Sequence, residues 1–318
     1  MGEFDLIDRY FKRPATRNPL GVGDDCALLG LAPGMQLAVS CDMLVEGRHF
    51  LSTIDPRKLG HKSLAVNLSD LAACGAEPLA FTLALALPQA DDAWLEPFSR
   101  GLLALADQHG CELVGGDTTR GPLNICVTVF GQVPPGQALL RSGARPGDDI
   151  YASGTLGDAR LALEVFRGTL ALPPELFTAA RTRLEQPTPR VALGVALRGV
   201  ATAAIDVSDG LAGDLGHVLD QSAVGARIEA EALLQLMAAP AGAVAAEHRL
   251  ECVLAGGDDY ELAFTAPPQR RQAVAAAAAI AGVRVTRIGR IEAEPGLRVV
   301  DAAGDPMPQR FASFDHFA

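Results

Sequence analysis

The chain of 318 residues has no long hydrophobic run, although 49% of its residues are hydrophobic. A membrane-spanning helix needs about 18 or more consecutive apolar residues. The N-terminal stretch MGEFDLIDRYF is acidic and amphipathic, whereas a secretory signal has a basic region followed by an apolar one. The sequence therefore predicts neither a membrane span nor a signal peptide.

Positive charge and paired cysteines are also scarce. The formal net charge is -11, which argues against nucleic acid and against an anionic membrane surface as partners, because both call for a basic face. None of the six cysteines stands in a C-x-x-C pair or a cluster with zinc spacing. We expect reduced thiols packed as small apolar residues, as in a cytoplasmic protein.

Several catalytic signatures are missing as well. The sequence contains no G-x-x-x-x-G-K-[ST], no G-x-G-x-x-G that opens a helix, no G-x-S-x-G and no H-E-x-x-H. These absences exclude a P-loop enzyme, a typical dinucleotide-binding fold, a hydrolase with a nucleophile elbow and a common zinc protease. The stretch DVSDGLAGDLG does not fit the calcium-binding EF-hand loop either.

What the chain does contain is helix and strand patterning in both halves, and its length favours two domains. In the first half the patterns predict helices at 3–12, 56–76 and 92–109, and strands at 26–31, 35–43, 79–87, 111–117 and 123–133. A Pro- and Gly-rich connection, 134–149, follows. In the second half we expect helices at 157–167, 174–185, 189–199, 210–221 and 268–281. Strands are expected at DDIYASG, at the run into Asp206, and at GARIEA, CVLAGG, YELAFTA, GVRVTRIG and GLRVVDA. This mixture indicates an α+β or α/β fold.

Aspartates gather where apolar runs end, often beside glycine. The stretch AIDVSDGLAGDLG, residues 204–216, carries three of them. Strand ends are where ligands usually bind in sheet proteins. The aspartates concerned are Asp24, Asp25, Asp42, Asp70, Asp117, Asp206, Asp209, Asp258 and Asp259. For any one of them a turn or a helix N-cap is the simpler explanation, and we assign that role to Asp214 and to one member of each Asp-Asp pair.

Asp70 lies on a predicted helix, where Ser63, Asn67, Asp70 and Cys74 share one face. The rest of this helix is small and apolar, so the stripe is either buried or a solvated face, and the pattern does not decide between them. Taken together, the acidic turns favour a hard divalent cation. Mg²⁺ prefers carboxylate oxygens, waters and substrate phosphates, whereas the His and Cys spacings of zinc sites are absent.

Eight motifs in order give the chain a family resemblance. They are GVGDDCALL, SCDMLVEGRHF, AVNLSDLAACGAEPLAFTLALALP, LVGGDTTRGPL, LLRSGARPGDDIYASGTLGD, AIDVSDGLAGDLGH, GGDDYELAFT and FDHF. In this set the chain resembles the thiamine-monophosphate kinases, within the superfamily of aminoimidazole ribonucleotide synthetase. The resemblance implies an N-terminal α/β domain over 1–137, which binds metal and ATP and whose sheet pairs across a homodimer. It also implies a C-terminal α+β domain over 138–318 that closes the active-site cleft.

The resemblance further implies an activity and its site residues. The activity is transfer of the γ-phosphoryl group of ATP to thiamine monophosphate, assisted by several Mg²⁺ ions. The implied magnesium ligands are Asp25, Ser40, Cys41, Asp42, Asp70, Asp117, Asp206 and Asp209; Cys41 stands where threonine is usual, so its side chain or its backbone carbonyl could serve. The implied ATP contacts are Gly116, Asp117, Arg141 and Ser208. The implied substrate contacts are His49, Asp258 (where glutamate is usual) and Phe314 (where tyrosine is common).

Two alternatives remain beside this interpretation. One is another ATP-dependent synthetase of the same superfamily, acting on a purine precursor or on selenide. The other is a non-catalytic, metal-dependent nucleotide-binding protein. The GRHF and FDHF motifs favour the thiamine enzyme over the first alternative. The acids present in all of the turns named above argue against the second.

Overall fold

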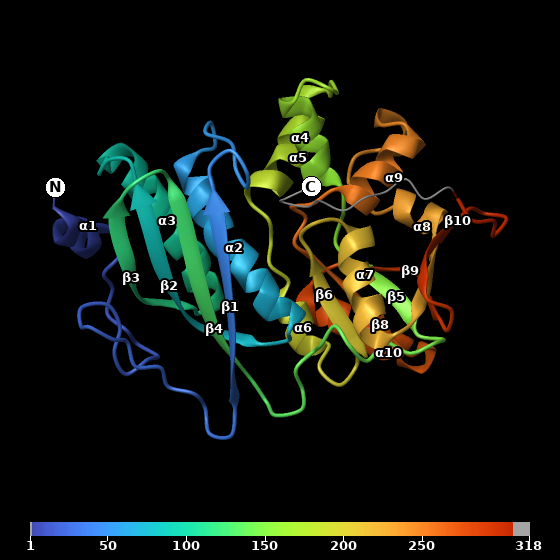
Figure 1. Ribbon diagram of the computed structural model, residues 1–318, viewed down its shortest axis with the longest axis horizontal. Helices are drawn as coiled ribbons and strands as arrows, with labels where there is room; N and C mark the ends of the chain where they lie inside the picture. The colour runs from blue at the N-terminus through green and yellow to red at the C-terminus, as the bar shows by residue number, and fades with distance from the viewer. Residues whose placement is uncertain (1, 308–318) are drawn as a thin grey trace. The chain divides into compact units, whose positions relative to one another are not determined.

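The chain folds as two units, each built on its own β-sheet (Figure 1). The computed structural model describes residues 2–307. The first unit consists of Met1–Leu71 and Ala76–Gly136, and the second of Ala72–Gly75 and Gln137–Ala318. Within the described residues, no helix is both long enough and apolar enough to cross a membrane.

The first unit carries a four-stranded sheet in the order β1-β4-β2-β3. Strand β4 pairs antiparallel with both of its neighbours, whereas β2 and β3 are parallel. The elements are α1 (Glu3–Tyr10), β1 (Gln36–Val45), α2 (Pro56–Ala73), β2 (Glu77–Leu87), α3 (Asp92–His109), β3 (Glu112–Arg120) and β4 (Asn124–Val133).

Helices α2 and α3 lie on one face of this sheet (Figure 1). Local sequence sets the ends of α3. The Asp91 side chain accepts a hydrogen bond from the backbone N–H of Ala93 at the N-terminus, and Gly110 adopts a left-handed conformation at the C-terminus. Along β1, by contrast, every second side chain faces away from the helices, and among these Leu37, Val39 and Met43 remain about half exposed.

The second unit carries a six-stranded sheet in the order β10-β7-β9-β5-β8-β6, in which only β10 and β7 are parallel neighbours. Its strands are β5 (Asp149–Ser153), β6 (Ala203–Val207), β7 (Gly225–Glu229), β8 (Glu261–Ala266), β9 (Val285–Glu292) and β10 (Gly296–Val300). Its helices are α4 (Asp158–Phe166), α5 (Pro174–Glu185), α6 (Val191–Ala196), α7 (Leu211–Ser222), α8 (Ala230–Leu234), α9 (Ala246–Ala255) and α10 (Arg271–Ala281), with 3₁₀ turns η1 (Ala241–Ala243) and η2 (Pro268–Arg270).

Apolar side chains of α7, α8 and α9 pack on this sheet to form the main core of the second unit. Leu215, Val253 and Leu254 from the helices join Ile150, Ile205 and Ile228 from the strands in one buried cluster. A separate apolar cluster lies under α4 and α5. The mixed α and β content predicted from the sequence is confirmed.

Two predicted strands are wrong. Residues 26–31 make no strand: Leu28 forms a single bridge with Leu20, while Ala27 and Leu29 pack against buried residues of the first sheet. The stretch CVLAGG is not a strand, because Cys252, Val253 and Leu254 lie in the helix α9 and are buried there. A short apolar run carries no clear period, so its sequence does not separate a buried strand from a buried helix.

Two strands also run past the aspartates that were predicted to end them. β1 continues beyond Asp42 to Val45, and β3 continues beyond Asp117 to Arg120. In both cases the next residues still pair in register with a neighbouring strand. These two aspartates therefore stand within the sheet, where the pleat fixes the face to which each side chain belongs.

Candidate active site

Strand β1 and helix α2 bring Ser40, Asp42 and Asp70 together in the first unit. The Ser40 hydroxyl donates a hydrogen bond of 2.6 Å to Oδ2 of Asp70. Two residues further along β1, the backbone N–H of Asp42 donates to Oδ1 of Asn67 at 3.1 Å. Ser63 and Asn67 are fully buried, and Asp70 and Cys74 are partly buried, so the polar stripe on α2 faces the protein interior along β1. This settles the question that the sequence left open for this helix.

Cys41 lies between these residues, and its side chain lies on the opposite face of β1. Its Sγ atom is 3.5 Å from Sγ of Cys126 and accepts a hydrogen bond of 3.3 Å from the Thr128 hydroxyl, both on β4. On the face that carries Ser40 and Asp42, Cys41 therefore offers only backbone atoms. A threonine hydroxyl is not needed for a backbone carbonyl to act as a ligand.

A groove of about 680 Å³ in the first unit is lined by Asp25, Gly116 and Asp117, three of the residues predicted from the sequence. The walls come from the N-terminal helix α1, the 22–25 loop and the strands β2 and β3. The Asp25 backbone N–H donates to the Asp24 carboxylate at 3.3 Å, which leaves Asp24 with the turn-forming role expected for one member of the pair. Lys12 and Thr118 also line this groove.

Glu112 holds the segment that leads to Asp25. Its Oε1 accepts hydrogen bonds from the backbone N–H and hydroxyl of Thr16 and from the backbone N–H of Arg17. Its Oε2 accepts from the backbone and side-chain amides of Asn18. Burial raises the pKa of Glu112, but these hydrogen bonds outweigh burial and lower the pKa to about 2. No local sequence pattern indicates this role, because the donors and the acceptor are more than 90 residues apart.

We expect Glu112→Gln to destabilise the first unit by about 2 kcal/mol, because an amide has one acceptor oxygen and turns its NH₂ group toward the remaining donors. In the parent protein the lowered pKa stabilises the fold at any pH above the ordinary value of 4.5, and that contribution is lost as the pH falls from there toward 2. Chemical denaturation at pH 7 and pH 3 measures both effects. The matched control is Glu96→Gln, an exposed surface pair with Arg100, for which little change is expected; an equal loss in both variants would contradict the role of Glu112.

His49 lies in the turn that follows β1. Its Nδ1 atom accepts a hydrogen bond of 3.0 Å from the backbone N–H of Val45, and its backbone carbonyl accepts one of 3.1 Å from the ammonium of Lys62. Lys62 lies in α2 and is only 1% exposed, so this buried hydrogen bond connects the turn to α2. With Nδ1 accepting, the Nε2 atom carries the proton of the neutral ring.

In the second unit Asp214 organises the loop that carries Ser208 and Asp209. Its carboxylate lies in the first turn of α7 and accepts hydrogen bonds of 3.0 Å from the backbone N–H groups of both residues. Asp214 is 4% exposed, and burial raises its pKa to about 7 against the lowering effect of these bonds. The structural role expected for Asp214 is confirmed. Of the three crowded aspartates of this stretch, Asp214 therefore shapes the loop that carries Asp209.

Of the other residues predicted in the second unit, Asp258 flanks the same loop and Arg141 does not. The backbone N–H of Asp258 donates to the Ser208 carbonyl at 2.9 Å, so the GGDD turn lies directly beside Ser208. Leu140, the neighbour of Arg141, accepts a hydrogen bond of 2.9 Å from the backbone N–H of Ala204 on β6, two residues before Asp206. The structure therefore brings Ser208, Asp209 and Asp258 together at the end of β6, which also carries Asp206. Arg141 lies toward the start of β6, where its backbone carbonyl accepts a hydrogen bond of 3.3 Å from the hydroxyl of Ser222 at the C-terminus of α7. Phe314 lies outside the described residues.

The candidate metal ligands offer oxygen atoms. Within residues 2–307, no three His, Cys, Asp or Glu side chains are grouped closely enough to hold a metal ion by themselves. Mg²⁺ typically takes one or two carboxylates and completes its shell with waters and substrate phosphates. A carboxylate with a neighbouring hydroxyl, as in the Ser40–Asp70 contact, fits this kind of coordination. A cation that takes all of its ligands from protein side chains would not fit.

Comparison with known proteins finds relatives that are similar to this chain along its whole length. Family models of AIR synthase related protein match it twice, the N-terminal domain over residues 23–133 and the C-terminal domain over residues 145–302. The chain is 47% identical over 329 residues to the thiamine-monophosphate kinase of Salmonella typhimurium, covering 100% of this chain and 98% of that protein.

Solved structures agree with the sequence match. The crystal structure of thiamine-monophosphate kinase from Stenotrophomonas maltophilia K279a is 46% identical, with a TM-score of 0.84 and 92% of each chain covered. A structure of AaThiL complexed with AMPPCP and TMP is 30% identical, with a TM-score of 0.77, and the match covers 91% of this chain and 89% of that one. The two-domain fold and the family resemblance predicted from the motifs are confirmed, and the chain belongs to the thiamine-monophosphate kinase family.

Proposed function

We propose that the chain transfers the γ-phosphoryl group of ATP to thiamine monophosphate, forming thiamine diphosphate and ADP. The observation that carries this proposal is the 47% identity to a thiamine-monophosphate kinase across the whole length of both proteins. The 30% identical AaThiL structure, which holds AMPPCP and TMP, supports the choice of an adenine nucleotide as co-substrate. Cytoplasmic ATP would be the phosphoryl donor, and the six free thiols suit that compartment.

We propose that the predicted ligand residues hold several Mg²⁺ ions. The proposed ligands are Asp25, Ser40, Asp42, Asp70, Asp117, Asp206 and Asp209, with the backbone carbonyl of Cys41. When bound, these ions would offset the repulsion between the two phosphorylated substrates and stabilise charge on the transferred group. The chain carries an excess of acid, with a formal net charge of -11, so bound cations would supply positive charge against the repulsion between the two anions.

The remaining residues would bind and orient the two substrates. Gly116, Asp117, Arg141 and Ser208 are proposed to contact the ATP phosphates, with the Arg141 guanidinium supplying positive charge from the protein. His49 and Asp258 are proposed to contact thiamine monophosphate, together with Phe314. A carboxylate and an aromatic ring suit the cationic thiazolium.

No side chain has to act as a general base in this reaction. The nucleophile is a phosphate oxygen of thiamine monophosphate, and the second pKa of a phosphomonoester is about 6, so the oxygen is already ionised at neutral pH. Direct in-line transfer needs only positioning and charge stabilisation from the protein. We therefore propose that no phosphorylated enzyme forms.

Release of ADP from ATP and Mg²⁺ in the presence of different acceptors tests the proposed reaction. We expect ADP to appear in step with thiamine diphosphate when thiamine monophosphate is present, and not with a purine precursor or selenide. ADP formation with either of those acceptors would favour another synthetase of the superfamily. ATP binding with no turnover on any acceptor would favour a nucleotide-binding protein instead.

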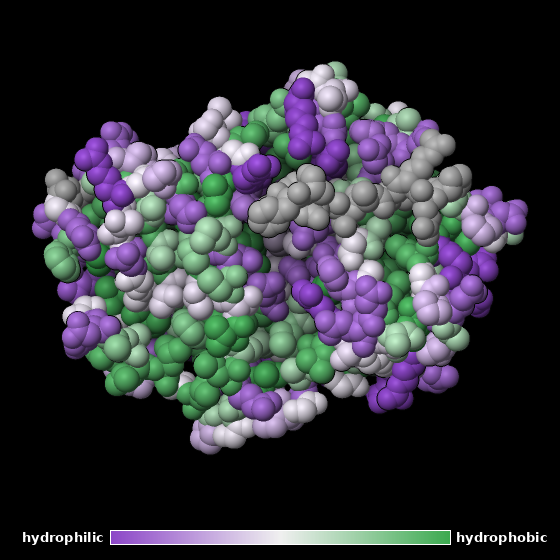
Figure 2. Space-filling model, in the orientation of Figure 1, coloured by the Kyte–Doolittle hydropathy of each residue, from purple (hydrophilic) through white to green (hydrophobic). Residues whose placement is uncertain are grey.

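We also propose that the chain forms a homodimer through the open face of the first sheet. Leu37, Val39 and Met43 lie on this face of β1 and are 46%, 56% and 53% exposed, and Figure 2 shows hydrophobic surface over the strands of this sheet. Large apolar side chains gathered on one sheet face mark an interaction surface more often than isolated ones do. A second copy of the same face would bury them symmetrically.

Val39→Glu is expected to convert the dimer to monomer, with at least about a hundredfold weaker association, because two charges would be buried against each other across the symmetric interface. Sedimentation velocity measures the change. The control is Ile280→Glu, which alters a 77% exposed apolar residue on α10 of the second unit and should leave the dimer intact. A parent protein that sediments as a monomer at all concentrations would rule out the dimer.

A further inference from the structure

Asp258 lies in a backbone conformation that needs support from its surroundings. It belongs to the turn of residues 256–260 between α9 and β8, and both Asp258 and Tyr260 have positive φ angles, 68° and 52°. Such angles are unfavourable for a residue with a Cβ atom. A turn of this kind keeps its shape only where neighbouring contacts fix it.

One set of contacts fastens the turn to the end of β6. The backbone N–H groups of Asp258 and Tyr260 donate to the carbonyls of Ser208 and Val207, at 2.9 and 2.8 Å. Gly257 passes so close that a Cβ atom there would be 2.4 Å from the Ser208 carbonyl oxygen. These two amide hydrogen bonds tie the position of Asp258 to the loop that carries Ser208.

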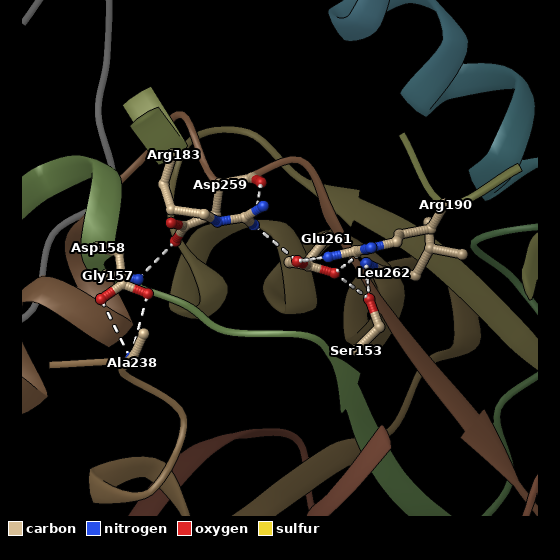
Figure 3. A network of polar contacts seen from close by, with 9 residues as sticks. All are labelled: Ser153, Gly157, Asp158, Arg183, Arg190, Ala238, Asp259, Glu261 and Leu262. Atoms are coloured by element: carbon tan, nitrogen blue, oxygen red, sulfur yellow. Dashed lines mark hydrogen bonds and ion pairs between the residues drawn. The ribbon is translucent and has the colours of Figure 1, made fainter. Parts of the chain in front are cut away.

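A second set of contacts fixes the residue at which the turn enters the sheet. Glu261, the first residue of β8, is 0% exposed. Arg183 of α5 donates to its Oε1 atom at 2.7 Å, and Arg190, which precedes α6, donates to Oε2 at 2.6 Å and also to Oε1 (Figure 3). Ser153 at the end of β5 donates to Oε2 at 2.6 Å and accepts from the Leu262 backbone N–H at 2.8 Å.

Arg183 also reaches the turn itself. Nη2 of Arg183 donates to the Asp259 carbonyl at 3.4 Å, and the Asp259 carboxylate, 0% exposed, accepts a hydrogen bond of 2.7 Å from the backbone N–H of Gly157 (Figure 3). A fully buried carboxylate is expensive unless charged partners and hydrogen bonds surround it. Arg183, Arg190 and Ser153 meet that need for Glu261 from three separate elements, so its side chain is held in one place.

We propose that Glu261, held by Arg183 and Arg190, is a positioning residue for Asp258 and thereby sets the affinity for the thiamine part of the substrate. The inference rests on the proposed function, in which Asp258 contacts thiamine monophosphate. None of the three positioning side chains needs to touch a substrate. Their effect reaches the site through the backbone of residues 257–261, whose strained turn relaxes when the support is removed.

Arg190→Lys tests the proposal, because lysine keeps the charge but cannot bind both carboxylate oxygens in parallel. We expect the KM for thiamine monophosphate to rise about tenfold, with kcat and the KM for ATP changed less than about twofold. In an Asp258→Ala background the same substitution should have no further effect on the KM for thiamine monophosphate. The control is Arg181→Lys on α5, whose guanidinium pairs with Glu185 at 2.8 Å and not with Glu261.

Equal rises in both KM values, or an undiminished effect of Arg190→Lys in the Asp258→Ala background, would overturn the proposal. Hydrogen exchange at the amides of Asp258 and Tyr260 provides a readout that does not depend on turnover. Exchange should be about tenfold faster in Arg190→Lys and unchanged in Arg181→Lys. Unchanged exchange in Arg190→Lys would reject the positioning role even if the chain had no kinase activity, whereas faster exchange without any activity would leave the positioning intact and reject the function.

Discussion

Asp70→Asn is expected to lower kcat by about a thousandfold or more while the protein stays folded. Asp70 stands at the meeting point of α2 and β1, where its Oδ2 atom accepts the Ser40 hydroxyl at 2.6 Å. Asparagine is nearly the same size and its amide oxygen can still accept that hydrogen bond, so the packing of α2 is kept. What disappears is one negative charge from the proposed magnesium ligands, and a neutral amide is a weaker ligand for a hard cation.

Initial rates measured over a wide range of Mg²⁺ concentration, together with a thermal melt, separate the two effects. The melting temperature should stay close to that of the parent, and excess Mg²⁺ should restore little of the rate. Asp107→Asn is the matched control, since Asp107 lies in the same unit, has a side chain that is 66% exposed, and forms an ion pair with Arg13 at the surface. Asp70→Asn with a rate within a few fold of the control would show that Asp70 holds no catalytic metal.

Gly116→Ala is expected to destabilise the first unit by about 3 kcal/mol and to abolish detectable ATP binding. Gly116 has a φ angle of 149°, and a Cβ atom there would lie 1.9 Å from the backbone oxygen of Leu83 and 2.6 Å from its carbonyl carbon. Leu83 is its register partner on β2. An alanine would therefore push β3 away from β2 and displace Asp117, which follows it in the groove.

The neighbouring glycine provides a close control. Gly115 has ordinary backbone angles, and the nearest atom to a Cβ placed there is Cγ2 of Thr82 at 3.9 Å. Gly115→Ala should therefore leave both stability and ATP affinity nearly unchanged. Denaturant unfolding and calorimetric titration with ATP and Mg²⁺ on the two variants measure the difference. Two variants that lose ATP binding to the same degree would argue against a specific role for the Gly116 backbone.

Elements whose ends are set by neighbouring residues could be predicted from the sequence. The predicted helices 92–109 and 174–185 have the same bounds as α3 and α5. Asp91 and Gly110 flank the first, and Pro174 begins the second, so the signals lie within a few residues of the helix. The strand predicted at CVLAGG is wrong for the opposite reason, because only the packing of this stretch within the second unit makes it helical.

The site shows the same division between local and distant contacts. The order of the acidic motifs was readable from the sequence, and so was the polar stripe that contains Asp70. The residues that support the site could not be predicted in this way. Glu112 meets Thr16 across 96 positions, and Glu261 meets Arg190 across 71, and no local pattern marks either carboxylate as buried and paired. Residues that hold a site in shape are found where chain segments meet, which requires the fold.

Transfer of label from ATP to thiamine monophosphate tests the central claim most directly. The purified chain is incubated with Mg²⁺, thiamine monophosphate and ATP labelled in the γ-phosphoryl group, and the products are separated at several times. We predict that the label appears only in the terminal phosphate of thiamine diphosphate, in an amount equal to the ADP formed, with no label on the protein. Label released as inorganic phosphate, or retained on the protein after mixing with ATP alone, would contradict direct transfer.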